Sequence, residues 1–202
     1  MNRRVIIAMT ISLCGVGGIT LAPGCASSTQ AGAYATDEGA PRNPQLAQEL
    51  NGQGVEKMLA DPGEAEALFR RALSADLYHG PAHNKLGVLM IESGRLYEAA
   101  EEFQWAARLM PGHPDPRINL GLVFERAGLT DDAMAHYRTA LEVYPGHLQA
   151  IQALTTAELR FGRADSATTD RLKVISLRGS TPWRLWAMER LAVIEVDNPL
   201  TN

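Results

Sequence analysis

The sequence contains few of the residues on which reactive or covalently stabilised proteins depend. Its two cysteines, Cys14 and Cys25, both precede the region expected to fold, so we expect no structural disulfide. No block of Lys or Arg occurs and the net charge is −4, which gives no support for a nucleic-acid partner. Motifs typical of hydrolases, P-loop nucleotide-binding proteins and zinc proteases are absent. We therefore predict a protein that is not an enzyme and that uses no cofactor, metal or small-molecule substrate.

The sequence instead contains an internal repeat. Its period is the separation in sequence between Ala65 and Ala99. Ala133 and Ala167 continue this alanine step. A leucine, a glycine and an aromatic position keep it as well: Leu86, Leu120 and Leu154; Gly94, Gly128 and Gly162; Phe69, Phe103 and Tyr137. A period of about 20–50 residues is typical of stacked supersecondary units, each too small to bury its own apolar face. The period favours a binding scaffold over a catalyst.

Two successive units, residues 80–113 and 114–147, carry the repeat in full. The first contains Leu86-Gly87 and then Ala99 with Phe103; the second has the same residue types, with tyrosine as the aromatic. This pattern resembles the tetratricopeptide repeat (TPR) family, whose motif is W-x2-L-G-x2-Y…A-x3-F…P. The resemblance implies an all-α fold, a right-handed superhelical stack of helix-turn-helix repeats. The leading tryptophan of the motif is replaced by His83 and Arg117.

The flanking units, residues 44–79 and 148–179, match the motif less well. In the unit 44–79, Gly52-Gln53 stands one period before Leu86-Gly87, where the motif has Leu-Gly. In the last unit Thr155 replaces the glycine and Arg171 the aromatic. Terminal repeats are expected to be atypical because one of their faces meets water.

Residues 180–202 are expected to form a capping helix and a tail. Thr181-Pro182 is a typical helix start, and the helix is expected to end near Val196. Trp183 and Trp186 either seal this end of the stack or anchor a partner.

Residues 1–24 have the features of a secretory signal peptide, because Arg3-Arg4 precedes a long apolar run. The stretch Leu21-Ala22-Pro23-Gly24-Cys25 resembles the bacterial lipobox, although Ala22 stands where that motif usually has leucine. The resemblance implies that Cys25 is acylated and becomes the mature N-terminus. Ordinary cleavage near Cys25 and an uncleaved membrane anchor are the alternatives.

All three alternatives place the repeats outside the cytoplasm. Residues 25–43 comprise the lipidated Cys25 and a small, polar, flexible tether, which would hold the domain on the order of 20–25 Å from the membrane. Ala26 after the cysteine resembles an outer-membrane sorting pattern. We thus expect an exported lipoprotein that is membrane-anchored through the Cys25 lipid, faces the periplasm or the cell surface, and lies preferably at the outer membrane.

A partner site is implied by the same family resemblance. In TPR proteins the first helices line a concave groove that holds a protein or peptide partner. Helical geometry places eight residues on the side opposite the Leu-Gly packing face: Asn84, Val88, Ile91, Ile118, Leu122, Arg126, Gln152 and Thr156. An apolar strip that the core does not need usually marks an interaction site. The alternative is that its aliphatic members pack against neighbouring first helices.

Two further sets of side chains have the residue types of a binding site. Some TPR proteins clamp a carboxylate with Lys, Arg and Asn, but the candidates here are scattered, and that mode is not expected: Asn84, Lys85, Asn119, Arg126 and Arg160. His79, His113 and His147 recur with the period. Packed helices lie about 8–10 Å apart, too far for residues in successive repeats to share one ion, so we expect these histidines at repeat junctions.

Together these features predict a non-catalytic envelope lipoprotein that acts as a TPR protein–protein interaction scaffold. By analogy with repeat lipoproteins, it would assist the assembly or localisation of an envelope complex, as a pilotin does. The alternatives are an accessory subunit or regulator of a cell-wall enzyme, a cryptic hydrolase and a self-assembling structural module.

Overall fold

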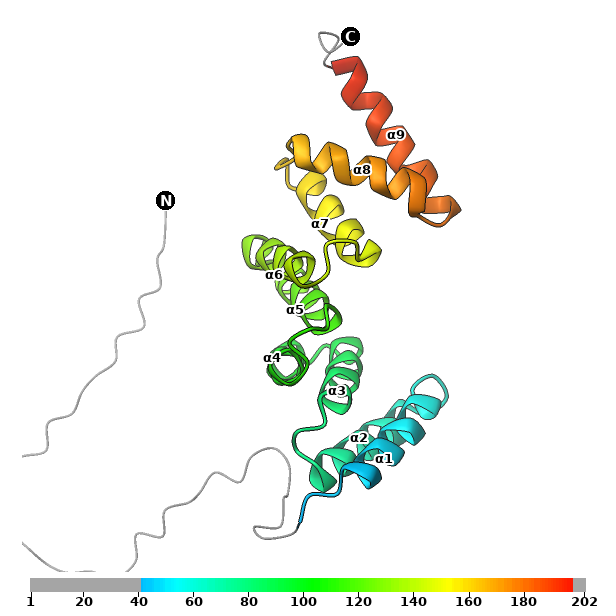
Figure 1. The fold of residues 1–202 in the computed structure, drawn as a ribbon, viewed down its shortest axis with the longest axis vertical. Coiled ribbons are helices and arrows are strands. Elements are labelled where there is room, and N and C mark those ends of the chain that lie inside the picture. Colours follow the sequence, from blue (N-terminus) through cyan, green and yellow to red (C-terminus); the bar gives the residue numbers. More distant parts are fainter. Residues whose placement is uncertain (1–40, 198–202) are drawn as a thin grey trace, which may run out of the picture. The chain divides into compact units, whose positions relative to one another are not determined.

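The computed structural model describes residues 41–197; the predicted signal peptide, Cys25 and the tether up to residue 40 lie outside the described residues. Within residues 41–197 the chain forms nine α-helices and no β-strand (Figure 1). In chain order they are α1 Pro44–Lys57, α2 Pro62–Ala75, α3 Gly80–Glu92, α4 Leu96–Leu109, α5 Asp115–Arg126, α6 Thr130–Val143, α7 Leu148–Arg160, α8 Ser166–Arg178 and α9 Thr181–Asp197.

The helices are arranged as stacked pairs, which confirms the predicted all-α repeat fold. Each of α1, α3, α5 and α7 packs against the helix that follows it, and that helix packs against the next pair. The first helices also contact one another, α1 with α3, α3 with α5 and α5 with α7, whereas no two second helices among α2, α4, α6 and α8 are in contact. First helices therefore lie on the inner side of the stack and second helices on the outer side.

In the first three pairs the helices cross at a glycine covered by an aromatic ring, and this contact accounts for the period. A methyl group on Gly54 would come within 2.5 Å of the Phe69 ring, and one on Gly87 within 2.7 Å of Phe103. Gly121 meets Tyr137 in the same way. The alanines four residues before these rings are fully buried: Ala65, Ala99 and Ala133. Small residues on both helices allow the close approach that buries each aromatic ring.

The terminal repeats follow this packing scheme with a shift of one residue, which corrects two predictions. Gly54, not Gly52-Gln53, contacts the aromatic of the first repeat. In the fourth repeat Thr168 and Leu172 are fully buried, whereas Ala167 is exposed. The place expected for Arg171 is therefore filled by Leu172. A connection between the paired helices that is one residue shorter or longer changes the spacing but keeps the packing.

The recurrent glycines form the turns within the pairs. Gly94, Gly128 and Gly162 have φ values of 77°, 76° and 66°, in the left-handed region that other residues rarely adopt. The residue after each glycine donates its N–H across the helix end, 2.8 Å to the carbonyl of Met90, Phe124 or Glu158. This is the Schellman arrangement that ends a helix and reverses the chain.

The fourth repeat is held together by polar contacts. Thr155, where the other repeats have glycine, is fully buried, and Glu158 is buried beside it on α7. Glu158 accepts hydrogen bonds from Thr168 Oγ1 at 2.8 Å and from Arg138 at 3.1 Å, and it also pairs with Arg171. In this repeat Leu172 takes the place of the aromatic ring, and charged and hydroxyl groups around Glu158 add polar contacts between the helices.

Helix α9 closes the described stack on α8. Ala187 is fully buried against Leu172 and Ile175, and four partly buried residues pack around them: Trp183, Trp186, Leu191 and Ile194. The two tryptophan rings pack edge to face, with centroids 5.2 Å apart. This side of α9 seals the end of the core, as the first of the two alternatives for the tryptophans predicts.

Candidate functional site

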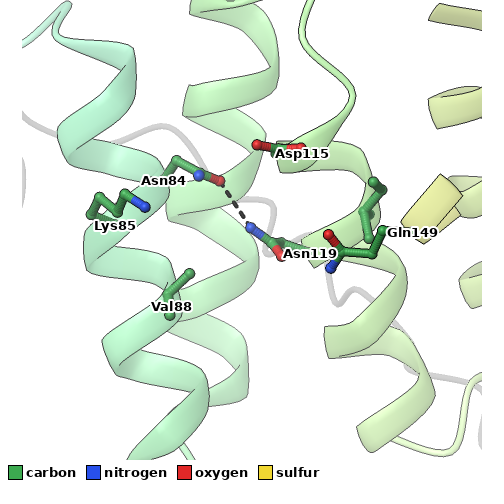
Figure 2. A pocket seen from close by; sticks show the side chains of 7 residues that line it. Asn84, Lys85, Val88, Asp115, Asn119 and Gln149 are labelled. Carbon is green, nitrogen blue, oxygen red and sulfur yellow. Dashed lines mark hydrogen bonds between the residues drawn. The ribbon is translucent and has the colours of Figure 1, made fainter. Parts of the chain in front are cut away.

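A polar pocket opens on the first helices, where α3, α5 and α7 meet (Figure 2). Its volume is about 130 Å³. The lining residues come from all three helices: Asn84, Lys85 and Val88 from α3; Asp115, Ile118 and Asn119 from α5; Gln149 from α7. The repeat explains the juxtaposition, because equivalent positions of adjacent first helices are brought side by side by the stacking.

Two asparagine amides face each other in the pocket. Asn119 Nδ2 donates a hydrogen bond of 3.0 Å to Asn84 Oδ1, marked in Figure 2. Each side-chain amide keeps one group free of hydrogen bonds to residues 41–197. The Asn84 side-chain NH₂ donates none, and the Asn119 side-chain oxygen, Oδ1, accepts none. A donor and an acceptor side by side match the C=O and N–H of an extended peptide backbone.

Charges of both signs border the amides. The Lys85 ammonium forms no ion pair with any described carboxylate. Asp115 lies 3.6 Å from His113 Nδ1 and 3.5 Å from His147 Nε2, so imidazole rings border its carboxylate on two sides. In this pocket the Lys85 ammonium can pair with an acidic group of a ligand. The Asp115 carboxylate can accept a hydrogen bond from a ligand.

The structure separates the predicted groove residues into three groups. Asn84 and Val88 line the pocket. Ile91 and Ile118 are only 5% and 4% exposed and belong to the apolar core, so for them the packing alternative describes the structure, although Ile118 also contributes to the pocket wall. The remaining apolar and polar positions, Leu122, Gln152 and Thr156, are half-buried along α5 and α7. The strip is thus a mostly packed wall with a polar pocket in it.

The arginines at the ends of the first helices link successive repeats. Arg126 Nη1 donates a 3.0 Å hydrogen bond to the carbonyl of Ile91, at the C-terminal end of α3. Arg160 pairs with Glu125, which also accepts a 2.9 Å hydrogen bond from Tyr137. The expectation that the five clamp-type residues stay scattered is wrong for three of them, because Asn84, Lys85 and Asn119 meet in the pocket. Arg126 and Arg160 do not line the pocket and instead contact the preceding first helix.

A buried histidine–carboxylate pair was missed by the sequence analysis. His83 Nδ1 lies 2.7 Å from Glu102 Oε2, and His83 Nε2 lies 2.9 Å from the carbonyl of Leu77, to which it must donate. The ring also stacks on Trp105, with centroids 5.7 Å apart. One feature of the sequence indicates this contact. His83 stands where the motif has tryptophan, a position that faces the second helix of the pair. The pair crosses between α3 and α4 and fixes their orientation.

Two of the recurrent histidines cap helices. His79 Nδ1 accepts a hydrogen bond from the Ala82 N–H at 3.2 Å, and His147 Nδ1 accepts one from Ala150 at 3.4 Å. His113 precedes Pro114 at the corresponding junction. In the part of the chain that the structure describes, no group of three His, Cys, Asp or Glu side chains could hold a metal ion. A search of the same residues finds no helix with the length and apolarity needed to cross a membrane.

Comparison with known proteins identifies the fold but no close relative. No protein-family model and no curated protein matches the sequence. Among solved structures, Pseudomonas aeruginosa PilF has a TM-score of 0.68 at 19% identity, covering 78% of this chain and 72% of its own. MamA has a TM-score of 0.56 at 22% identity, covering 74% and 82%. The first TPR domain of Spaghetti (RPAP3), solved with the HSP90 peptide SRMEEVD, has a TM-score of 0.56 at 16% identity, covering 60% and 97%. The described chain thus has the stacked-repeat fold of TPR proteins.

Proposed function

We propose that this protein is a non-catalytic interaction scaffold that binds an extended segment of a partner protein across α3, α5 and α7. The observation that carries the proposal is the pocket on the first helices, where the Asn84–Asn119 amide pair and the Lys85 ammonium face the same space. The amides suit a peptide backbone, and Lys85 suits an acidic side chain or a C-terminal carboxylate. Peptide binding by the RPAP3 TPR domain supports this choice.

Site-specific photo-crosslinking tests the peptide site. A photoreactive amino acid at the exposed Gln149 should capture the partner in cells, and the same group at Gln104 on α4 should not. Lys85→Glu should reduce capture at least about tenfold, because it reverses the charge that faces the ligand. Equal capture from Gln104, or capture unchanged by Lys85→Glu, would place the partner elsewhere.

The finer proposal concerns where the scaffold acts. A lipid on Cys25 would tether the repeats to an envelope membrane, and the protein would there assist the assembly or localisation of an envelope complex, in a pilotin-like role. The positively charged start, the apolar run and the residues before Cys25 support it. The fold similarity to PilF, which extends over most of both chains, is compatible with it.

Membrane fractionation tests the anchor. Cys25→Ser should release the protein from membranes or leave the unprocessed precursor. A Cys25→Ser protein that is still processed and still membrane-bound would exclude the lipid anchor. A crosslinked partner that is a cell-wall enzyme, with activity altered by the purified scaffold, would favour the regulatory alternative.

A further inference from the structure

Helix α9 has the residue spacing of a first helix, with Ala187 buried and Leu191 and Ile194 partly buried. In α3, α5 and α7 three buried residues keep the same spacing. The second lies four positions after the first, and the third lies three positions after the second: Ala82, Leu86 and Leu89; Pro116, Leu120 and Val123; Ala150, Leu154 and Ala157. Ala187, Leu191 and Ile194 keep this spacing in α9 and pack against α8. Thus α9 packs on α8 with the residue spacing of a first helix, but unlike α3, α5 and α7 it makes no contact, within the described chain, with the preceding first helix, α7.

The other side of α9 is uncovered. In α3 the residues one place after this set, His83 and Gly87, are buried beneath α4. Their counterparts in α9 are Met188, 48% exposed, and Ala192, also exposed. Leu185, one turn before Met188, is 58% exposed. Among residues 41–197 only α8 contacts α9, so no described helix takes the place that α4 takes on α3.

The two ends of the described stack differ. Helix α1 turns polar residues outward, including Gln45, Glu49 and Glu56, as the end of a repeat stack requires for solubility. Leu46 and Val55 of α1 are also exposed, but they lie nine residues apart, on opposite sides of the helix, and form no stripe. Helix α9 presents Leu185, Met188 and Ala192 at the spacing of a helix–helix seam. An apolar stripe at this spacing is typical of a surface that packs against another helix.

We propose that the stripe formed by Leu185, Met188 and Ala192 binds an amphipathic helix of a partner protein, which completes the repeat begun by α9. The template for this contact is the pairing of first and second helices that recurs through the stack. The surface is separate from the pocket on the first helices. A second copy of α9 is a poorer occupant, because a twofold axis near Met188 would bring the two Glu189 carboxylates together.

Ala192 determines which side chain the partner helix presents. At Gly87 the absence of a Cβ leaves room for Phe103, and an added methyl would lie 2.7 Å from that ring. Thr155 does carry a Cβ, and its repeat has Leu172 where the others have an aromatic ring. The partner helix therefore places a leucine against Ala192. On that helix a small residue lies four positions before the leucine and an apolar residue three positions after it, as in Thr168, Leu172 and Ile175 of α8.

Two peptides based on α2 test this inference. Residues 61–77 carry Ala65, Phe69 and Ala72 at the required spacing, and a second peptide carries Phe69→Leu. Fluorescence anisotropy with the full chain should show about tenfold tighter binding of the leucine peptide, because the phenyl ring would overpack against Ala192. Ala192→Gly in the protein should reverse this preference.

Two protein variants provide the controls. Met188→Asp should abolish binding of both peptides, whereas Leu59→Asp, at a 99% exposed position on the α1–α2 turn, should leave it unchanged. Circular dichroism would check that both variants fold. Binding of neither peptide, or binding that survives Met188→Asp, would overturn the proposal. A dimer of the chain that Met188→Asp dissociates would overturn it in favour of a second copy.

Discussion

At the scale of single residues, the glycines of the first helices differ sharply in function. Gly87 is buried against the fully buried Phe103, so the ring has no free space into which to move. Gly52 is also within a helix, but an added Cβ there meets no atom within 4 Å. Residue type alone does not separate these two positions, because only the opposite helix makes one of them essential.

This difference predicts opposite outcomes for the same substitution. Gly87→Ala should lower the free energy of unfolding by about 1–3 kcal/mol through overpacking. Gly52→Ala should raise it by up to about 1 kcal/mol, since alanine loses less backbone entropy in a helix. Urea denaturation of both variants measures the effect. Equal stability changes in the two would contradict the proposed crossing.

The stability of the fold is expected to depend on pH through His79. Burial lowers its pKa from the ordinary value of 6.5. Its Nδ1 accepts the Ala82 N–H, and its Nε2 lies 3.0 Å from Gln48 Oε1. Only a neutral ring can donate to Gln48 and accept from Ala82 at the same time. A histidine with a depressed pKa stabilises the fold above its unfolded pKa, and that stability is lost as the pH falls through the folded value.

The pH dependence of stability should therefore change when this histidine is replaced. Between pH 7.5 and pH 5 the parent should lose more stability than His79→Asn, which keeps a capping side chain without a titrating ring. The difference should be on the order of 1 kcal/mol, the usual contribution of a helix cap. Denaturation midpoints at the two pH values measure it, and parallel losses in parent and variant would rule out His79 as a titrating cap.

At the scale of elements, the packing repeats more faithfully than the spacing along the chain. Gly54 and Phe69 are one position closer in the sequence than Gly87 and Phe103. Their counterparts in the fourth repeat, Thr155 and Leu172, are one position further apart. The turn between paired helices absorbs the difference. A constant alanine step consequently gives the correct residues for the two central repeats and errs by one in the terminal repeats.

A matched pair of alanine substitutions tests this register. Ala133 is fully buried at a helix crossing, whereas Ala167, the next alanine of the series, is exposed. Ala133→Leu should cost about 1–3 kcal/mol, and Ala167→Leu should change stability by less than about 0.5 kcal/mol. Thermal melting of both variants distinguishes the two registers, because a strictly constant step would make the two costs equal.

At the scale of the whole molecule, the apolar core is uneven. A single cluster of buried side chains extends from α1 to α5, whereas the cluster between α7 and α9 has only four buried members: Ile151, Leu172, Ile175 and Ala187. Between α7 and α8, Thr155 and Leu172 replace the glycine–aromatic contact, and the buried Glu158 pairs with Arg138 of α6 and Arg171 of α8. In repeat proteins stability is roughly a sum of local terms and neighbour interfaces, so such a gradient persists along the stack.

Hydrogen exchange should report this gradient directly. Amides of α8 and α9 should exchange faster than those of α2 to α4, because they open with fewer buried apolar contacts. Mass spectrometry of the exchanging protein gives the protection of each helix. Uniform protection from α2 to α9 would show a single cooperative unit instead.

The fold class, the helix pairs and the turn glycines could be predicted from the amino-acid sequence, because these follow from a period and from local conformational preference. The buried alanines and aromatics of the central repeats could be predicted from it as well. Three features became visible only in the folded chain: the pocket shared by two asparagines and a lysine, the burial of Ile91 and Ile118, and the contact between His83 and Glu102. Those facts depend on how adjacent repeats are rotated against one another. A spacing along the chain does not contain that rotation, because it arises from the packing of both helix faces at once.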